Sequence, residues 1–90
     1  MEYTEQQHRA KVADAIQYIE SLPSLADSIS KDIYFKNAKD FAEGRKDFDT
    51  AYDGDGLGYG WSPYSSDMVC RVLLNKPDLA MSVAKTYWGK

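Results

Sequence analysis

Cysteine is almost absent from the sequence, and with it the means of building an internal disulfide framework. The one cysteine, Cys70, has no second cysteine in the chain to pair with. Such a composition is typical of a reducing compartment, so we expect a cytoplasmic protein. Residues 1–7 have neither the basic start nor the apolar run of a signal peptide, which agrees with this expectation.

Long hydrophobic runs are also missing. A membrane-spanning helix needs about 18 consecutive apolar residues, and the sequence has no such stretch. We therefore expect no transmembrane helix and no membrane partner.

Catalytic and metal-binding signatures of high specificity are absent as well. His8, the one histidine, has no nucleophile beside it in sequence, and we expect it to be a solvent-exposed residue of a helix. Cys70 lies in the most apolar run and is expected to be a small core residue, because apolar surroundings suppress the reactive thiolate. The sequence predicts a protein that is not an enzyme and carries no cofactor.

The composition of the sequence is typical of a globular domain. The 90 residues are 43% hydrophobic and 28% charged, which argues against wholesale disorder. A chain of this length buries about 60 to 65% of the surface that it exposes when unfolded. We expect a single helical domain over residues 1–90.

The net charge of −3 is unevenly distributed. Residues 47–67 carry five acids and no lysine or arginine, whereas residues 68–90 carry four basic residues and one acid. Charge separation of this kind affects encounter rates and the choice of partner more than it affects the fold.

The first helix is predicted over residues 4–21. Thr4 and Gln7 have the spacing of a capping box, and Pro23 limits the helix at its other end. An apolar stripe follows at helical spacing, formed by Val12, Ala15, Ile16, Ile19 and Leu22.

The second helix is predicted over residues 24–52, with Ser24 as its cap and Asp27 in its first turn. Its predicted buried stripe consists of Leu25, Ala26, Ile29, Ile33, Ala38 and Phe41. Gly44 is a weak point in this helix, where a left-handed C-terminal cap is the alternative.

The tripeptide Lys-Asp-apolar recurs three times between Lys31 and Phe48, at steps of eight and seven residues. These steps approximate two helical turns and favour a helix that continues through Gly44, because a glycine inside a helix costs about 1 kcal/mol. The alternative is an α+β fold with a β-hairpin at 47–61, since Phe48, Thr50 and Tyr52 alternate.

Two more helices are predicted, over residues 63–75 and 78–88. Ser62 and Pro63 suit the start of the third, whose apolar run makes it the most buried helix. Pro77 separates the two, and the last helix is predicted to bury Leu79, Ala80, Val83, Ala84 and Tyr87. The sequence thus predicts an all-α protein, a small four-helix domain with one acidic, aromatic, glycine-rich loop.

That loop, residues 52–64, holds four of the six glycines and four of the twelve aromatic residues. Tyrosine and tryptophan are enriched at the centres of protein interfaces because rigid rings bury large areas at low entropic cost. We expect the partner-binding residues to be Tyr52, Asp53, Asp55, Tyr59, Trp61 and Tyr64. The open alternative is that Tyr59 and Trp61 fold back to cover the core.

Two other interpretations of residues 52–64 are weaker. Asp53 and Asp55, with Asp49, resemble the start of a calcium loop, but Leu57 and Tyr64 stand where later oxygen ligands are required. A glycine-rich phosphate cradle is disfavoured because the surrounding acids repel a polyphosphate.

The favoured hypothesis is a non-catalytic protein-binding domain of inhibitor or adaptor type, whose acidic aromatic loop engages a basic surface of a protein partner. Immunity proteins and phage-encoded inhibitors of host defence offer an analogy of size and charge. One alternative is a nucleic-acid or nucleotide binder that uses Arg71, Lys76, Lys85 and Lys90. Another is a structural subunit that self-associates through Tyr87 and Trp88.

Overall fold

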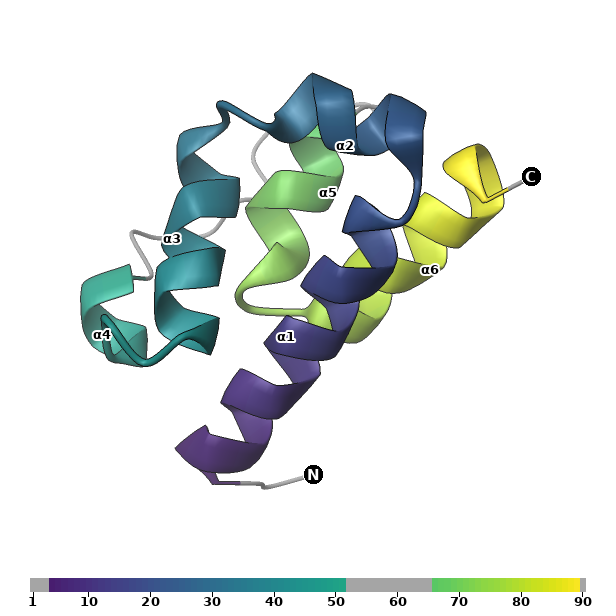
Figure 1. The fold of residues 1–90 in the computed structure, drawn as a ribbon. Helices are drawn as coiled ribbons and strands as arrows, with labels where there is room; N and C mark the ends of the chain where they lie inside the picture. Colours follow the sequence, from purple (N-terminus) through teal and green to yellow (C-terminus); the bar gives the residue numbers. More distant parts are fainter. Residues whose placement is uncertain (1–3, 52–65, 90) are drawn as a thin grey trace.

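The computed structural model describes residues 4–51 and 66–89, and within them the chain is helical (Figure 1). Neither of these two stretches contains a β-strand, so the all-α prediction is confirmed. The helices are α1 (Glu5–Glu20), α2 (Pro23–Ile29), α3 (Ile33–Ala42), α4 (Phe48–Ala51), α5 (Ser66–Leu73) and α6 (Pro77–Trp88). The helical turn at α4 disfavours the hairpin alternative, the remainder of which lies outside the described residues.

Helix α1 forms as its sequence predicts. The backbone N–H of Gln7 donates to the Thr4 hydroxyl (3.1 Å), and the backbone N–H of Thr4 donates to the Gln7 side chain (2.8 Å). This capping box satisfies N–H groups that have no partner within the helix. The inner stripe is buried as predicted, at Val12, Ala15, Ile16 and Ile19, with Leu22 partly buried.

The predicted helix over residues 24–52 is wrong, because the chain forms three shorter helices there. Pro23, rather than Ser24, opens α2, with Leu22 at the capping position. Asp32 then starts a new helix, since its carboxylate accepts the backbone N–H groups of Tyr34 (2.8 Å) and Phe35 (3.3 Å). This side-chain cap fixes the beginning of α3 independently of the register of α2.

The new register changes which side of α3 is buried. Phe35, Ala38 and Phe41 face the core, at 6%, 0% and 0% exposure. Ile33, which the sequence places in the buried stripe, is 65% exposed. Residues two apart in a helix point to nearly opposite sides, so Phe35 inside leaves Ile33 outside.

Gly44 ends α3 instead of continuing it. Its φ is +83°, in the left-handed region that favours glycine. The N–H of Gly44 donates to the carbonyl of Phe41 (3.1 Å), and the N–H of Arg45 donates to that of Asp40 (2.8 Å). These two bonds form a Schellman motif, which satisfies the last carbonyl groups of the helix and turns the chain away.

The last two helices are divided at Pro77, as predicted. Helix α5 ends at Leu73 and Pro77 is the first residue of α6. The apolar run of α5 is buried throughout, and Cys70 is 1% exposed, which confirms it as a core residue. The predicted face of α6 is only partly right, because Ala80 and Ala84 are fully buried but Leu79 and Tyr87 are 37% and 43% exposed.

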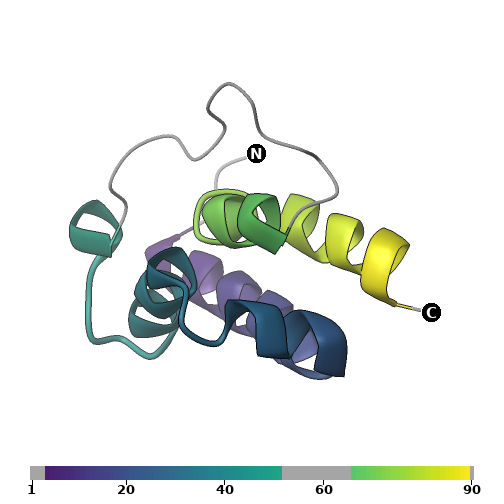
Figure 2. The same cartoon turned by 90° about the horizontal axis from the view of Figure 1, so that it is seen from above.

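The helices pack in two layers. Seen from above, α5 and α6 lie over α1, α2 and α3 (Figure 2). Helix α1 packs against α3 and α6, and α5 packs against α3 and α6. One contiguous cluster of buried side chains joins the layers, and its largest fully buried members include Ile19, Leu25, Ile29, Phe41 and Leu73.

A search of the described helices finds none that is long and apolar enough to cross a bilayer.

Candidate functional site

The six residues predicted to bind a partner, Tyr52, Asp53, Asp55, Tyr59, Trp61 and Tyr64, lie outside the described residues. The two ends of their segment are described. Ala51, the last residue of α4, is 2% exposed, and Val69 in α5 is fully buried. Both α4 and α5 pack against α3.

The entry to this segment is held by Asp47, the residue before α4. Its Oδ1 accepts the backbone N–H of Thr50 (2.8 Å), and its carbonyl accepts that of Ala51 (3.0 Å). Hydrogen bonds from the side chain and the backbone of Thr50 lower the pKa of Asp47, and the charge of Arg9 adds to the effect. These interactions favour the ionised form of Asp47, which stabilises the short helix α4.

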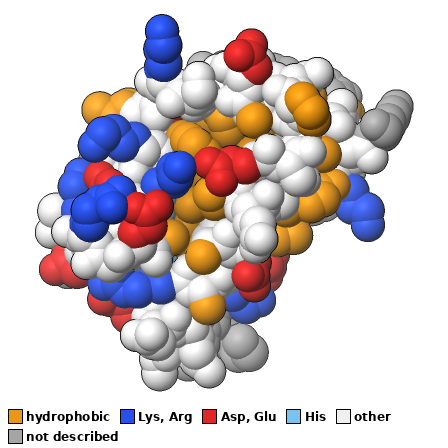
Figure 3. Space-filling model, viewed as in Figure 1, with side chains coloured by type: hydrophobic (Ala, Val, Ile, Leu, Met, Phe, Trp, Pro, Cys, Tyr) orange, Lys and Arg blue, Asp and Glu red, His pale blue; other side chains and the backbone are white. Residues whose placement is uncertain are grey.

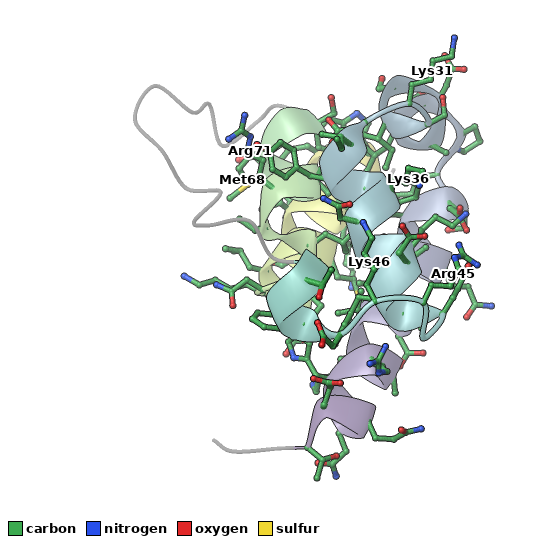
Figure 4. All side chains as sticks on the ribbon, turned by 90° about the vertical axis from the view of Figure 1, so that its left-hand side faces the viewer. Lys31, Lys36, Arg45, Lys46, Met68 and Arg71 are labelled. Carbon is green, nitrogen blue, oxygen red and sulfur yellow. The ribbon has the colours of Figure 1, made fainter. Side chains whose placement is uncertain are left out.

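Three cationic side chains surround one buried carboxylate on α3, a cluster that the sequence analysis did not find. Asp40 is 5% exposed. Arg45 donates to its Oδ1 from Nε (3.1 Å) and from Nη2 (3.0 Å). The Nζ atoms of Lys36 and Lys46 lie 3.5 and 3.7 Å from its Oδ2. Figure 4 shows Lys36, Arg45 and Lys46 along one side of α3.

The electrostatics of this cluster keep Asp40 charged. The hydrogen bond from Arg45 lowers the pKa of Asp40, and the positive charges of Lys36, Arg45 and Lys46 lower it further, against the opposing effect of burial. A buried carboxylate without such partners would be strongly destabilising. Lys36 stands one helical turn before Asp40 and is visible from the sequence, whereas Arg45 and Lys46 return to Asp40 because of the Schellman turn.

Arg9 of α1 holds the same turn against the N-terminal helix. Its Nη1 donates to the carbonyl of Phe41 and to that of Lys46 (3.0 Å), and its Nη2 pairs with Glu5 (2.8 Å). The guanidinium also lies over the Phe41 ring, 4.6 Å from its centre. Arg9 is thus a structural residue, which supplies charged donors to one carbonyl at the end of α3 and to one in the turn that follows it.

His8 is not the solvent-exposed helix residue that the sequence predicts. It is half-buried, and its Nε2 lies 2.7 Å from the carbonyl oxygen of Leu74. Its ring packs edge-on against Phe41 and Phe48, with ring centres 5.4 and 5.5 Å apart. The prediction failed because the residues that enclose His8 are far from it in sequence.

A shallow hollow of about 510 Å³ lies between α1 and the end of α3, lined by Gln6, Arg9, Ala10, Ala13, Ala42, Glu43 and Gly44. A smaller one of about 210 Å³ continues it toward Ile16, Glu20 and Lys39. The charged groups around these hollows are paired with one another or with neighbours, as in the ion pair of Lys39 with Glu20 (3.1 Å). Because these charged groups already have partners, neither hollow presents a clear set of groups for binding a ligand.

The cations proposed for nucleic-acid binding do not form one track among the described residues. The guanidinium of Arg71 lies over the Tyr34 ring, 4.4 Å from its centre. Lys76 and Lys85 stand at opposite ends of α6. The aromatic pair proposed for self-association is in mutual contact, with ring centres 6.3 Å apart; Tyr87 is exposed, whereas Trp88 packs against the core.

The described residues contain no group of three or more His, Cys, Asp or Glu side chains placed to hold a metal ion. The alternative calcium site at Asp53 and Asp55 lies outside these residues, as does the side chain of Asp49. The described residues contain two features that bear on function. One is the buried carboxylate of Asp40 with its three cationic partners, and the other is the buried Ala51 just before residues 52–65.

Comparison of the chain with protein-family models, with curated protein sequences and with solved structures finds no match in any of the three.

Proposed function

We propose that the chain is a small, non-catalytic protein-binding domain of inhibitor or adaptor type. It contacts a basic surface of a protein partner through residues 52–64, which connect α4 to α5. The contact residues are Tyr52, Asp53, Asp55, Tyr59, Trp61 and Tyr64.

The observation that carries this proposal is the anchoring of the segment at both ends. Ala51 and Val69 are buried on its two sides, and the helices that hold them both pack against α3. A segment closed in this way has fewer conformations to lose on binding than a free tail of the same length. Anchoring therefore lowers the entropic cost of presenting rings and carboxylates to a partner.

The composition of the segment sets the chemistry of that partner. Residues 47–67 carry five carboxylates and no lysine or arginine, so the complementary surface is positively charged. Tyr59 and Trp61 supply rigid apolar area for the centre of the contact. Because the proposed contact depends on the attraction of opposite charges, salt weakens the association.

The test is an affinity capture from a lysate of the source organism or its host. The bait is the wild-type chain, a triple variant of the segment (Asp53→Ala, Asp55→Ala, Trp61→Ala), or a matched triple variant elsewhere (Asp14→Ala, Asp27→Ala, Tyr87→Ala). In the control, the two acids lie on exposed positions of α1 and α2, and Tyr87 is exposed on α6. Circular dichroism establishes that all three baits are helical.

We expect a protein that is retained by the wild type and by the control but released by the segment variant and by salt. Equal retention by all three baits would place the contact elsewhere. Loss with the control alone would favour the surface around Tyr87.

A further inference from the structure

A second candidate surface lies on α3. Lys and Arg side chains gather over this helix, with some Asp and Glu side chains among them and hydrophobic side chains beside them (Figure 3). Ile33, 65% exposed, occupies the first position of α3. Lys36 and Asn37 follow it by three and four residues and so share its side of the helix. We call Lys31, Ile33, Lys36 and Lys46 the α3 surface.

Lys36 of the α3 surface is exposed, while Asp40, the acid that it pairs with, is turned inward. The side chain of Lys36 is 74% exposed, whereas that of Asp40, its partner, is 8% exposed. The carboxylate of Asp32 accepts two backbone N–H groups at the start of α3. An anion that approaches Lys36 therefore meets its ammonium group before it meets the carboxylate of Asp40.

Asp40 also holds these cations in place. Lys46 is fixed twice, because its Nζ lies 3.7 Å from Asp40 and donates to Asn37 Oδ1 (3.1 Å). A lysine ammonium has three donors, so Lys36 and Lys46 retain capacity for a further carboxylate. Positions that are fixed before binding reduce the side-chain entropy lost in forming a contact. Figure 4 shows Lys31 at the N-terminal end of α3, in line with Lys36 and Lys46.

We propose that the α3 surface binds an acidic protein segment that carries an apolar side chain: Ile33 packs against the apolar residue, and Lys31, Lys36 and Lys46 pair with the carboxylates. The lysines favour an acidic partner. The exposed Ile33 favours a protein over a nucleic acid, because an isoleucine side chain cannot stack on a base as an aromatic ring does. Tyr34, the nearest aromatic residue in sequence, is already covered by Arg71.

This inference does not depend on residues 52–64 and goes beyond the function proposed for them. A chain with an acidic contact segment and a separate cationic surface can engage two partners of opposite charge. Of the two types, inhibitor and adaptor, such an arrangement favours the adaptor.

The test is fluorescence anisotropy with a labelled synthetic peptide of Glu-Leu-Glu-Glu-Leu repeats at low salt. A second peptide replaces Leu by Ser, a third replaces Glu by Lys, and the fourth probe is an oligothymidylate. The α3 variant is Lys31→Gln, Ile33→Ala, Lys36→Gln. The matched control makes the same kinds of change on α6, as Lys76→Gln, Leu79→Ala, Lys85→Gln, since Leu79 is also exposed.

We expect the Glu-Leu peptide to bind the wild type and the control equally, and the α3 variant at least about tenfold more weakly, a difference of about 1.4 kcal/mol. The peptide with Ser should bind more weakly than the peptide with Leu. No binding of the Glu-Leu peptide, or equal loss in both variants, would overturn the proposal. Binding of the oligothymidylate that the α3 variant loses would assign the surface to nucleic acid instead.

Sedimentation of the free protein decides whether a second copy of the chain is the occupant. A monomer supports an external partner. A dimer that the α3 variant abolishes would overturn the proposal, because the α3 surface would then be occupied by another copy of this chain.

Discussion

The guanidinium of Arg9, in α1, lies 4.6 Å from the centre of the Phe41 ring and donates to the carbonyl of Phe41 at the end of α3. A single side chain thereby joins the N-terminal helix to the turn that carries the chain from α3 to α4. This turn also brings Arg45 and Lys46 to Asp40. The position of Arg9 thus bears on both surfaces proposed here, the α3 surface and residues 52–64.

Replacing Arg9 by methionine should lower the free energy of unfolding by about 1.5 to 3 kcal/mol. Methionine keeps the apolar contact with Phe41 but leaves the carbonyls of Phe41 and Lys46 without their charged donor. Urea denaturation measures the change. Lys11→Met in the same helix is the control and should cost less than half as much; equal losses would contradict the role assigned to Arg9.

Replacing Gly44 by alanine should cost about 1 to 2 kcal/mol, because a side chain makes the left-handed conformation unfavourable. A Cβ at this position meets no atom within 4 Å, so the cost is conformational and not steric. Asparagine tolerates the left-handed region and should cost less than alanine. Urea midpoints of the three proteins measure this order, and an alanine variant as stable as the wild type would contradict it.

Replacing His8 separates its hydrogen bond from its packing. His8→Phe keeps ring contacts with Phe41 and Phe48 but loses the donor to Leu74, at a cost of about 1 kcal/mol. His8→Ala loses both and should cost about 2 to 3 kcal/mol. Thermal or urea denaturation distinguishes the two variants. If neither loses stability, His8 is the exposed residue that the sequence predicted.

The stability of the fold should depend on Asp40 in acid. Because its pKa in the folded state lies below the ordinary value of 3.8, the stabilisation is complete above that value and is lost as pH falls through the folded pKa. Asp40→Asn should therefore be less stable than the wild type at neutral pH, and the difference should shrink as the pH falls below the ordinary value of 3.8. Urea midpoints measured over this pH range test the prediction.

Asp47 is the second group with a lowered pKa, so it adds its own loss of stability in acid. Asp47→Asn should remove a separate part of the pH dependence. An Asp40→Asn protein whose pH profile parallels that of the wild type would show that Asp40 contributes nothing to this dependence.

Local signals in the sequence were sufficient for the ends of α1 and for the division between α5 and α6. The capping box at Thr4 and the imino ring of Pro77 act within one helical turn, so their effect is independent of the rest of the chain. The cap at Asp32 is equally local, but the repeated Lys-Asp-apolar tripeptide favoured one continuous helix across it. Periodicity alone cannot show that two helices with similar spacing are separated by a cap.

The cluster at Asp40 and the burial of His8 were beyond sequence reasoning for a different reason. Arg45 and Lys46 approach Asp40 only because Gly44 reverses the chain, and Leu74 reaches His8 across 66 residues. Contacts of this kind depend on how the helices pack, and helix packing cannot be predicted from a local sequence pattern. The α3 surface depends on the same packing. Ile33 is exposed because Phe35, two residues later, is on the buried side of α3.

The central claim is that the aromatic rings of residues 52–64 are available to a partner. The most direct measurement is acrylamide quenching of Trp61 fluorescence in a Trp88→Phe variant, in which Trp61 is the one remaining tryptophan. We expect quenching close to that of free tryptophan and a red-shifted emission maximum, which denaturant should change little. A blue-shifted, protected Trp61 that becomes accessible only on unfolding would contradict the claim and assign the ring to the core.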